Sequence, residues 1–487
     1  MAQEEKLRNI VGSPNILDDP ESLEEYSKDM SFVEPRKPSY IAKPKSSDQV
    51  QKMVKLASEE LIPLTPVSSP GGPRFHGDTI PYPGGVVVDL SGINRVLRVD
   101  RHNKTVHIEP GVTFEQLRSE LRKSGLKPFM PLMPRQTKSV LTSYLERNPI
   151  LSPRHHWDTL DPLYTTEVIF GTGDAFRTGS AAGPGPTDEL LAAGASLSAP
   201  MGPGPTDYGR LIQGAQGTMG IVTWAVCACC LLPTIQHPYF VTSAEMESLI
   251  EFMYALLRRR HGDELFLVNS FALANAIADK PEDIKSVAAD LPPWIVFLNI
   301  AGYEKFPEER VAYQEEDASE FAKQYKCKLL HSVDGVSSSA LLKRLEETPK
   351  DVYWKLKFKG GCEDVFFLTT LNKVPEFVDY VYKTAVAYGY ASTELGVYAQ
   401  PIVQGTSCHL EFDLMYNPED VKEREKVKKL YLHLSEGLAN LGAFYTRPYG
   451  VWSDIAYRRD AETTALLRKI KKIFDPNDIL NPGRLCF

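Results

Sequence analysis

Side chains that could take part in chemistry gather in two stretches of the C-terminal half of the chain. In the first, His409, Glu411 and Asp413 alternate with other residues, so a β-strand would place all three on one face. Such a histidine could ligate a metal, face a substrate or serve only the structure. In the second, Tyr445 and Arg447 stand two positions apart. A tyrosine and a guanidinium that does not titrate can bind and orient a phenolate or a carboxylate.

Two glycine-rich stretches indicate a phosphate-bearing ligand, because glycine lets backbone N–H groups approach a pyrophosphate. The first follows a predicted strand at 61–67, and its candidate contacts are Ser69, Gly71, Gly72, Arg74, Phe75 and His76. Pro70 and Pro73 interrupt this stretch and supply no donor, so a surface turn explains it as well as a ligand cradle. The second, residues 207–223, precedes an apolar strand. Its candidate contacts are Gly214, Gln216, Gly217, Gly220, Ile221 and Val222.

The composition of the chain is that of a globular protein with two or three domains. It has 487 residues, 43% hydrophobic and 24% charged. A net charge of -8 argues against nucleic acid as a partner. No apolar leader begins the chain, and the apolar run 221–232 is shorter than the ~20 residues that a membrane helix needs. The seven cysteines form no disulfide framework, and Cys227, Cys229 and Cys230 are expected to be buried strand thiols. We therefore expect a cytoplasmic protein without a membrane span.

The hydrophobic pattern predicts an α/β region followed by a different second domain. Residues 1–36 are polar and are expected to wrap the surface. The first region is predicted to contain helices at 47–60 and 114–123, strands at 61–67 and 86–90, and a hairpin over 96–109. In the second, helices at 243–260, 307–325, 374–388 and 418–440 alternate with strands at 294–301, 365–370, 396–401 and 408–415. This pattern is typical of a mostly antiparallel sheet covered by helices.

Several motifs together resemble one flavoprotein superfamily, that of vanillyl-alcohol oxidase and p-cresol methylhydroxylase, which also includes D-lactate and glycolate dehydrogenases. The C-terminal string 474–484, Phe-Asp-Pro-Asn-Asp-Ile-Leu-Asn-Pro-Gly-Arg, is similar to the signature that closes its FAD-binding domain. Residues 84–90, 94–97, 109–113, 167–179 and 207–223 match further pieces of that domain. The resemblance implies an α+β fold with a two-part FAD-binding domain of the vanillyl-alcohol oxidase type and a cap domain. Its parts would be an N-terminal extension (1–37), the FAD-binding domain (38–236), the cap (237–440) and a C-terminal segment that returns to the FAD domain (441–487).

The resemblance also implies site residues. Asp158 falls where the phenol-oxidising branch has an acidic residue beside the flavin, and that branch uses a tyrosine and an arginine near Tyr445 and Arg447. Asn481 belongs to the C-terminal signature and is expected to contact the cofactor. The metal-binding core of the D-2-hydroxy-acid branch is missing around His409, so no metal is expected. FAD is expected to be non-covalent, with His76 as the candidate for a covalent link.

The function that follows is an FAD-dependent oxidoreductase that takes a hydride from a small organic substrate. An aromatic alcohol or 4-alkylphenol is favoured by Asp158, Tyr445 and Arg447, with His409 as a further candidate. The alternatives are a D-2-hydroxy-acid dehydrogenase of the lactate or glycolate kind, and an electron-relay flavin subunit or degenerate binder without catalysis. Electrons would pass to oxygen or to a separate acceptor protein. Homo-oligomerisation stays open.

Overall fold

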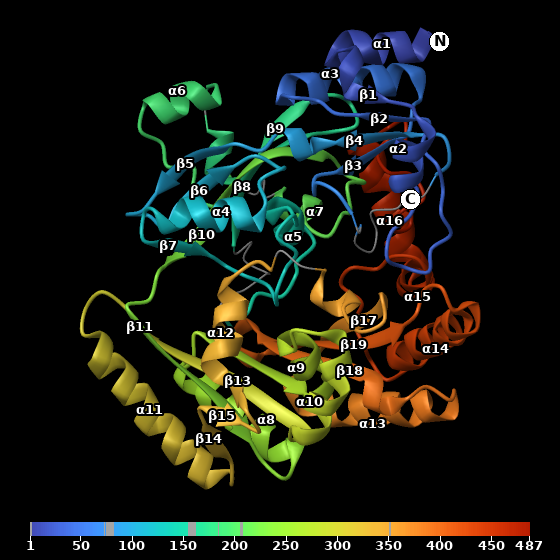
Figure 1. The fold of residues 1–487 in the computed structure, drawn as a ribbon. Coiled ribbons are helices and arrows are strands. Elements are labelled where there is room, and N and C mark those ends of the chain that lie inside the picture. Colours follow the sequence, from blue (N-terminus) through green and yellow to red (C-terminus); the bar gives the residue numbers. More distant parts are fainter. Residues whose placement is uncertain are drawn as a thin grey trace.

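The chain folds into two halves built around separate sheets (Figure 1). The computed structural model describes residues 2–72, 74, 82–153, 162–183, 185–204, 208–349 and 352–487. The upper half in Figure 1 holds the N-terminal elements and the C-terminal helix, and the lower half, called the cap below, runs from β11 (Ile235–Thr242) to α14 (Val421–Asn440). No helix of the described part of the chain is both long and apolar enough to cross a membrane.

The first sheet of the upper half is mainly parallel. Its strand order is β1-β2-β4-β3, with bounds Ile16–Leu17, Tyr40–Ala42, Val86–Asp89 and Leu64–Val67. Strands β2, β4 and β3 run parallel, and β1 pairs antiparallel with β2. The predicted helix α3 (Ser47–Glu60) packs on this sheet through Val50, Met53 and Val54, whose spacing places them on one helical face. This sheet ends at the cleft described below.

The N-terminal segment is more regular than the expected surface wrap. Helix α1 (Ala2–Val11) buries Leu7 and Val11 in the same core as α3, and β1 adds an edge strand to the first sheet. Helix α2 (Pro20–Glu25) follows. A helix needs only one apolar stripe to dock, and two buried side chains in a charged segment give too weak a signal to predict it.

The second sheet of the upper half is antiparallel. Its order is β5-β6-β10-β8-β9, and β7 pairs with the far end of β10; the bounds are Val96–Asp100, Thr105–Ile108, Ile221–Leu231, Leu163–Ile169, Ala175–Arg177 and Leu126–Pro128. The predicted hairpin is confirmed as β5 and β6. Helices α4 (Phe114–Arg122), α5 (Val140–Leu145), α6 (Thr187–Ala192) and α7 (Gly209–Ile212) accompany it. Cys227 and Cys229 on β10 are buried and Cys230 is half-buried, and none of these three described thiols is in a disulfide.

The cap contains a seven-stranded sheet in which every pairing is antiparallel, as predicted. Its order is β14-β11-β13-β12-β18-β19-β17, with β14 at Lys328–Leu330, β13 at Trp294–Gly302, β12 at Glu264–Asn269, β18 at Leu395–Ile402, β19 at Ser407–Tyr416 and β17 at Gly361–Thr369. Strands β15 (Ser332–Val333) and β16 (Val336–Ser337) form a separate pair.

Helices cover both faces of the cap sheet. Helices α8 (Met246–Arg259), α11 (Pro307–Gln324), α13 (Val374–Ala387) and α14 share one hydrophobic core with the first face. Helices α9 (Ser270–Ile277), α10 (Ile284–Asp290) and α12 (Ser338–Glu346) cover part of the second face. The rest of that face, on β17, β18 and β19, looks toward the upper half and carries the polar residues of the site.

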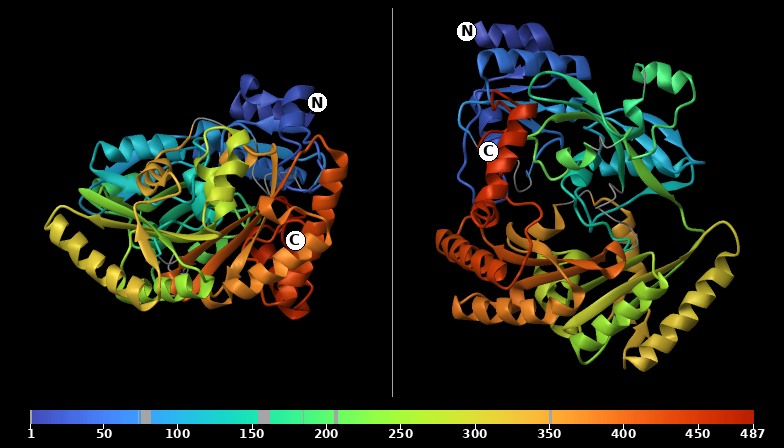
Figure 2. Two further views of the ribbon diagram at one scale, coloured as in Figure 1. Left: turned by 60° about the horizontal axis from the view of Figure 1, so that its bottom comes forward. Right: turned by 180° about the vertical axis from the view of Figure 1, so that it is seen from behind.

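The chain ends by returning to the upper half. Helix α15 (Val451–Tyr457) leads to α16 (Ala461–Phe474), which lies beside the N-terminal elements in Figure 1 and in the right view of Figure 2. After α16, Leu480 forms a parallel bridge with Leu64 of β3. The C-terminal stretch therefore becomes part of the first sheet's edge, more than 400 residues after β3.

Candidate functional site

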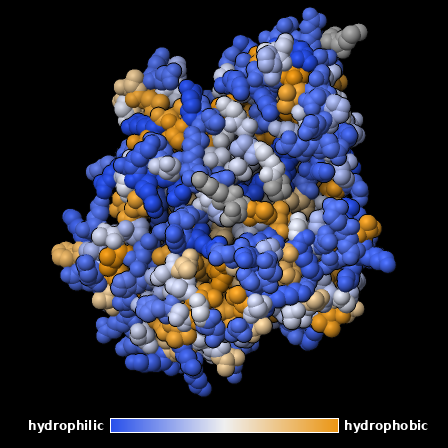
Figure 3. Space-filling view, viewed as in Figure 1, coloured by the Kyte–Doolittle hydropathy of each residue, from blue (hydrophilic) through white to orange (hydrophobic). Residues whose placement is uncertain are grey.

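A cleft of about 1100 Å³ lies between the upper half and the cap. Figure 3 shows a mostly hydrophilic face, with hydrophobic residues gathered near the boundary between the two halves. The upper half contributes the end of β3, helix α5 and the turn before β10, the cap contributes Phe366, and the segment between α14 and α15 contributes Arg447 and Tyr449. The cleft is lined by many of the predicted cofactor contacts: Ser69, Gly214, Gln216, Gly217, Gly220, Ile221, Val222 and Asn481.

The turn at 214–220, which joins α7 to β10, needs its glycines. Gly214 and Gly217 have φ values of +72° and +73°, which side-chain-bearing residues rarely adopt. A Cβ on Gly217 would lie 2.6 Å from Cγ of Pro66, and one on Gly220 would lie 2.3 Å from Cγ2 of Val168. The turn can therefore pack against β3 and β8 only because these positions have no side chain, and its backbone is left to form one wall of the cleft.

Asn481 fixes the turn from the C-terminal side. Its Nδ2 donates to the carbonyl of Gln216 at 2.6 Å, and its Oδ1 accepts from Oγ1 of Thr65 at 3.1 Å. Asn481 itself has a φ of +47°, a conformation that asparagine tolerates better than most residues. The side chain thus holds β3 and the glycine turn at one separation.

Lys471 and Asp475 complete this connection inside the protein. Lys471 is 1% exposed, and its Nζ donates to the carbonyls of Thr218 at 2.6 Å and Leu480 at 2.9 Å and to Oδ2 of Asp475 at 2.5 Å. The fully buried Asp475 also accepts the backbone N–H of Ile479. A buried ion pair satisfied in this way orients both the glycine turn and the C-terminal stretch. No motif in the sequence predicted the role of Lys471.

The first glycine-rich stretch lies partly outside the described residues. Gly71 and Gly72 are exposed and do not line the cleft, whereas Phe75 and His76 fall outside the described residues. Arg74 is 4% exposed and lies over the ring of Tyr26, with 3.6 Å from Cζ to the ring centroid. Among the described residues its Nε and Nη2 have no hydrogen-bond partner. Arg74 is thus a buried cation with donors to spare.

The cleft suits an elongated ligand with a planar group and phosphates. The glycine turn presents backbone where a Cβ would collide, and backbone N–H groups in such turns bind anions. Oε1 of Gln216 and Nε of Arg447 are buried without a hydrogen-bond partner among the described residues. Apolar contacts from Leu141, Leu145 and Val222 suit a flat ring system.

A second pocket adjoins the cleft, and Phe366 and Arg447 line both spaces. Its walls are aromatic and basic, with Trp354 from the 3₁₀ helix Trp354–Leu356, Tyr398 from β18, and Arg135 and Lys138 from the segment before α5. Trp354 is 2% exposed, and its indole Nε1 has no hydrogen-bond partner in the described part of the chain. A small molecule bound here would lie next to whatever occupies the cleft.

Among the predicted site residues, Arg447 lies at the junction of the cleft and the pocket. Its guanidinium is 8% exposed, lies 4.0 Å over the ring of Phe366 and donates from Nη1 to Oδ1 of Asn148. Within the described residues, no carboxylate pairs with it in an ion pair. A buried guanidinium that is held by an amide and a ring, and keeps a free donor, is suited to an anionic ligand.

Tyr445, the expected partner of Arg447, points elsewhere. Its hydroxyl donates to the carbonyl of Ser435 on α14 at 2.8 Å, and its ring stacks on Trp452 with centroids 4.6 Å apart. It belongs to the hydrophobic core of the cap and lines neither the cleft nor the pocket. The two residues are separated because the segment is irregular, so their spacing does not place them on one face. Asp158 lies outside the described residues.

His409 lies behind the pocket and reaches it only through Glu411. Nε2 of His409 is 3.2 Å from Oε2 of Glu411, and the histidine is 1% exposed. Burial lowers the pKa of His409, so the ring is neutral. Glu411 lines the pocket, and it was weighed in the sequence only as an insufficient metal ligand.

Lys355 was missed in the sequence, and it is central to this wall. Its Nζ lies 2.6 Å from Oε1 of Glu411, 2.9 Å from Oδ2 of Asp364 and 3.0 Å from Oδ1 of Asp413. Cys362, Asp364 and Asp413 have ligand atoms within 4.8 Å of one another, a grouping that could hold a metal ion. Here the ammonium of Lys355 already contacts two of these three residues.

Two protein families match separate parts of this chain. The family described as "FAD binding domain" matches residues 38–137, and "FAD linked oxidases, C-terminal domain" matches residues 262–485. An uncharacterized FAD-linked oxidoreductase of Mycobacterium tuberculosis is 23% identical and covers 98% of this chain and 97% of its own length. The 4-cresol dehydrogenase flavoprotein subunit of Pseudomonas putida is 22% identical, with 99% and 94% covered, and a mitochondrial D-lactate dehydrogenase of Arabidopsis thaliana is 23% identical, with 92% and 73% covered.

Solved structures share the whole fold. A substrate-bound p-cresol methylhydroxylase superimposes with a TM-score of 0.78 at 19% identity and covers 100% of this chain and 96% of its own. A 4-ethylphenol oxidase from Gulosibacter chungangensis gives 0.80 at 17% identity, with 99% and 96% covered. At such identities the likeness shows the fold alone.

Fold, cleft and family matches together define a flavoprotein oxidoreductase whose cofactor is FAD. The predicted resemblance to the superfamily of vanillyl-alcohol oxidase and p-cresol methylhydroxylase and the predicted fold are confirmed. Ser69, most of the turn at 214–222 and Asn481 line the cleft and would hold FAD there.

Proposed function

We propose that the protein oxidises a small aromatic substrate, an aromatic alcohol or a 4-alkylphenol, in the pocket beside the flavin cleft. The observation that carries this proposal is the position of Arg447, buried at the junction of cleft and pocket without a carboxylate partner among the described residues. An ionised phenol oxygen would supply the missing anion. Phe366, Trp354 and Tyr398 would enclose the aromatic ring and exclude water.

Different residues of the chain then bind the substrate and accept its hydrogen bonds. FAD, when bound, supplies the oxidising power by accepting a hydride from the substrate carbon. Arg447 binds the anionic oxygen, and its contact with Phe366 fixes the direction of that bond. Burial opposes ionisation of Glu411, but Lys355 and His409 outweigh it and keep the pKa of Glu411 below its usual range. Glu411 can therefore accept a hydrogen bond from a substrate hydroxyl without being protonated.

A panel of substrates tests the proposal directly. The oxidised enzyme would be mixed anaerobically with 4-alkylphenols, benzylic alcohols, D-lactate and glycolate, and bleaching of the flavin followed in a stopped-flow instrument. We expect rapid reduction by one of the two aromatic classes. Arg447→Met should lower kcat/KM on the order of 10²–10³-fold, because it removes a desolvated charge pair. Arg459→Met, an exposed arginine in the same segment, is the matched control and should change little.

A 2-hydroxy acid is the second candidate. Arg135 and Lys138 are buried residues that line the same pocket as Arg447, and although Lys138 pairs with Glu146 at 2.9 Å, this basic wall suits a carboxylate as well as a phenolate. Reduction by lactate- or glycolate-like acids alone would establish this candidate and refute the aromatic one.

We further propose that reduced flavin is reoxidised by oxygen or by a separate acceptor protein. The name of the Pseudomonas putida relative, a flavoprotein subunit, supports a separate acceptor. Oxygen uptake during turnover, compared with turnover in the presence of an artificial electron acceptor, would separate the two.

A further inference from the structure

The wall of the substrate pocket contains a buried lysine surrounded by acids. Lys355 leaves a 3₁₀ turn and places Nζ within 3.0 Å of carboxylate oxygens of Asp364, Glu411 and Asp413. Lys355 is 4% exposed, Glu411 8%, Asp364 1% and Asp413 0%. The contact with Glu411 is a hydrogen bond, whereas those with Asp364 and Asp413 are ion-pair contacts at 2.9 and 3.0 Å.

Strand register explains why the acids converge. Asp364 on β17 and Asp413 on β19 are direct cross-strand partners, and Glu411, two residues before Asp413, lies on the same face of β19. Like charges placed directly opposite each other destabilise a sheet, so this arrangement requires a proton, a cation or both. Burial and the neighbouring Glu411 and Asp364 raise the pKa of Asp413 well above its usual range, against the opposing effect of Lys355.

The cation of the cluster is Lys355 itself. Burial alone would lower its pKa, but Asp364, Asp413 and Glu411 together raise it well above the usual value of lysine. Lys355, Glu411 and Asp364 all line the pocket, and the contact of Lys355 with Glu411, a hydrogen bond of 2.6 Å, is the shortest that the ammonium makes. Cys362 donates its thiol to the other oxygen of Asp364 at 3.1 Å, which leaves that carboxylate fixed from two sides.

We propose that Lys355 is a positioning residue, an internal counter-cation that fixes Glu411 as an anion at the wall of the substrate pocket. The identity of the substrate rests on the proposed function, whereas the charge state of the wall does not. The other titratable or charged groups that face this wall are Cys362 and Asp364 on β17, His409 and Asp413 on β19, Tyr398 on β18, Tyr353 beside the 3₁₀ turn, and Arg447.

Removing the ammonium should create a site for a small ammonium ion. In Lys355→Ala the vacated space opens into the pocket, because Lys355 lines it. Ethylammonium carries the same charge and the same three donors, so it can replace the lost group. Tetramethylammonium carries the charge without any N–H donor, and therefore serves as the control for ionic strength.

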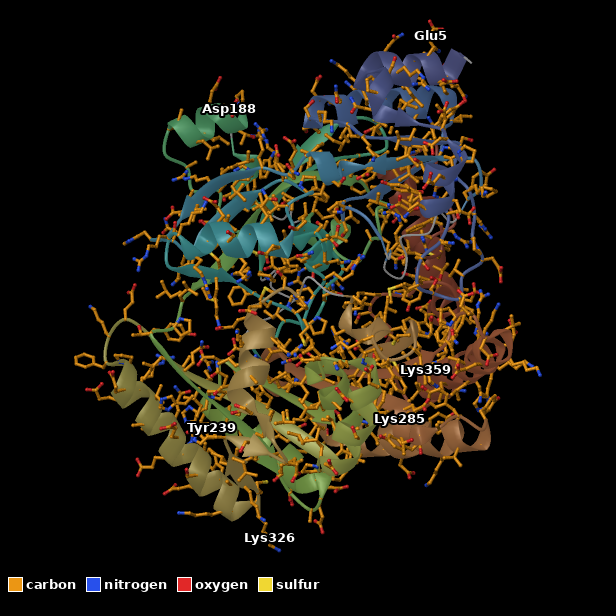
Figure 4. The ribbon with its side chains drawn as sticks, viewed as in Figure 1. Glu5, Asp188, Tyr239, Lys285, Lys326 and Lys359 are labelled. Carbon is orange, nitrogen blue, oxygen red and sulfur yellow. The ribbon has the colours of Figure 1, made fainter. Side chains whose placement is uncertain are left out.

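The experiment compares Lys355→Ala with Lys359→Ala. Lys359 also joins two acids, Glu394 and Glu423, but at a half-exposed position on the flank of the cap, where it is labelled with Lys285 in Figure 4. The melting temperature and the rate constant of flavin reduction would be measured for both variants in ethylammonium or tetramethylammonium chloride. For Lys355→Ala we expect at least a hundredfold slower reduction, and a saturable recovery of at least tenfold with a higher Tm in ethylammonium only. Lys359→Ala should show neither the slower flavin reduction nor the recovery in ethylammonium.

The pH profile separates positioning from a purely structural role. In the wild type, Glu411 stays ionised, so the reduction rate should lack an acid limb due to this group. In Lys355→Ala an acid limb should appear, and ethylammonium should abolish it. Equal responses to the two ammonium salts, or an unchanged pH profile, would overturn the inference. The Tm readout needs no substrate, so it stands even if neither substrate class reduces the flavin.

If Lys355→Ala does not accumulate, a double-mutant cycle replaces it. Lys355→Met should be strongly destabilised, and Lys355→Met with Glu411→Gln should be less so, because one buried carboxylate has been removed with its counter-cation. Additive losses of yield and Tm would refute the coupling.

Discussion

Replacing Lys471 by methionine should both destabilise the protein and weaken FAD binding. The substitution keeps most of the side-chain volume but removes three bonds, to Thr218, Leu480 and Asp475, and leaves the 0%-exposed carboxylate of Asp475 without its cation. Breaking a buried pair from one side costs ~3–5 kcal/mol. Asp475 keeps the backbone N–H groups of Ile479 and Leu480, so the lower end, about 3 kcal/mol, is expected.

This free energy converts into measurable shifts. For a domain of this size, 1 kcal/mol corresponds to roughly 2–4 °C, so Tm should fall by ~6–12 °C. The carbonyl of Thr218 belongs to the glycine turn that lines the cleft, and loosening it should raise the Kd for FAD by up to ~10²-fold. Thermal melts of the apoprotein and fluorescence titration with FAD measure the two effects separately.

Lys472→Met is the matched control. Lys472 is the next residue, its side chain is 55% exposed, and its ion pair with Asp478 is 3.9 Å long, so its loss should cost ~0–1 kcal/mol. Adding Asp475→Asn to Lys471→Met should recover part of the stability, since the unpaired charge is then gone. Equal melts for Lys471→Met and Lys472→Met, or no recovery in the double variant, would refute the reasoning.

Two further predictions concern the upper half. Gly217→Ala should lower FAD occupancy and Tm more than Gly194→Ala. Both glycines have a positive φ, but only at Gly217 would a Cβ lie 2.6 Å from Cγ of Pro66. Equal absorbance ratios of flavin to protein and equal Tm values for the two variants would contradict this. Burial lowers the pKa of His107, which packs on Trp224, to about 4. The pKa of His107 in the folded state lies below its unfolded value of about 6.5. Its contribution to the free energy of unfolding is therefore fully present above pH 6.5 and falls by about 2 kcal/mol by pH 5. His107→Gln should reduce the difference between the Tm values at pH 7 and pH 5, and an unchanged difference would show that His107 is not responsible.

The cofactor cleft could be predicted from the sequence because its parts are backbone features. Gly217 and Gly220 occur where a side chain would collide with a neighbouring strand, so few other sequences can build this turn. Asn481 lies in a short string whose hydrogen bonds reach Gln216 and Thr65. Constraints of this kind leave a readable pattern of residue types, even between segments separated by hundreds of positions.

The substrate pocket was harder to predict because it depends on the direction in which each side chain points, which the residue type does not determine. Tyr445 and Arg447 are two positions apart, yet one turns into the core under α14 and the other into the pocket. The sequence shows only the spacing, and in an irregular segment spacing does not fix direction. Asp158 was chosen by position alone and lies outside the described residues.

Lys355 could not be predicted because its burial depends on residues from two other strands. A lysine in Tyr-Trp-Lys-Leu-Lys-Phe is ordinarily solvent-exposed, since burying an isolated ammonium costs several kcal/mol. The cost disappears only where β17 and β19 bring Asp364, Asp413 and Glu411 together, and those acids are equally unfavourable without the lysine. Burying any one of these four side chains alone is therefore unfavourable, and burying them together is not. The four positions constrain one another, although no local sequence pattern marks any of them. A pocket wall of this kind can carry a fixed charge without a metal ion, because the chain supplies its own cation.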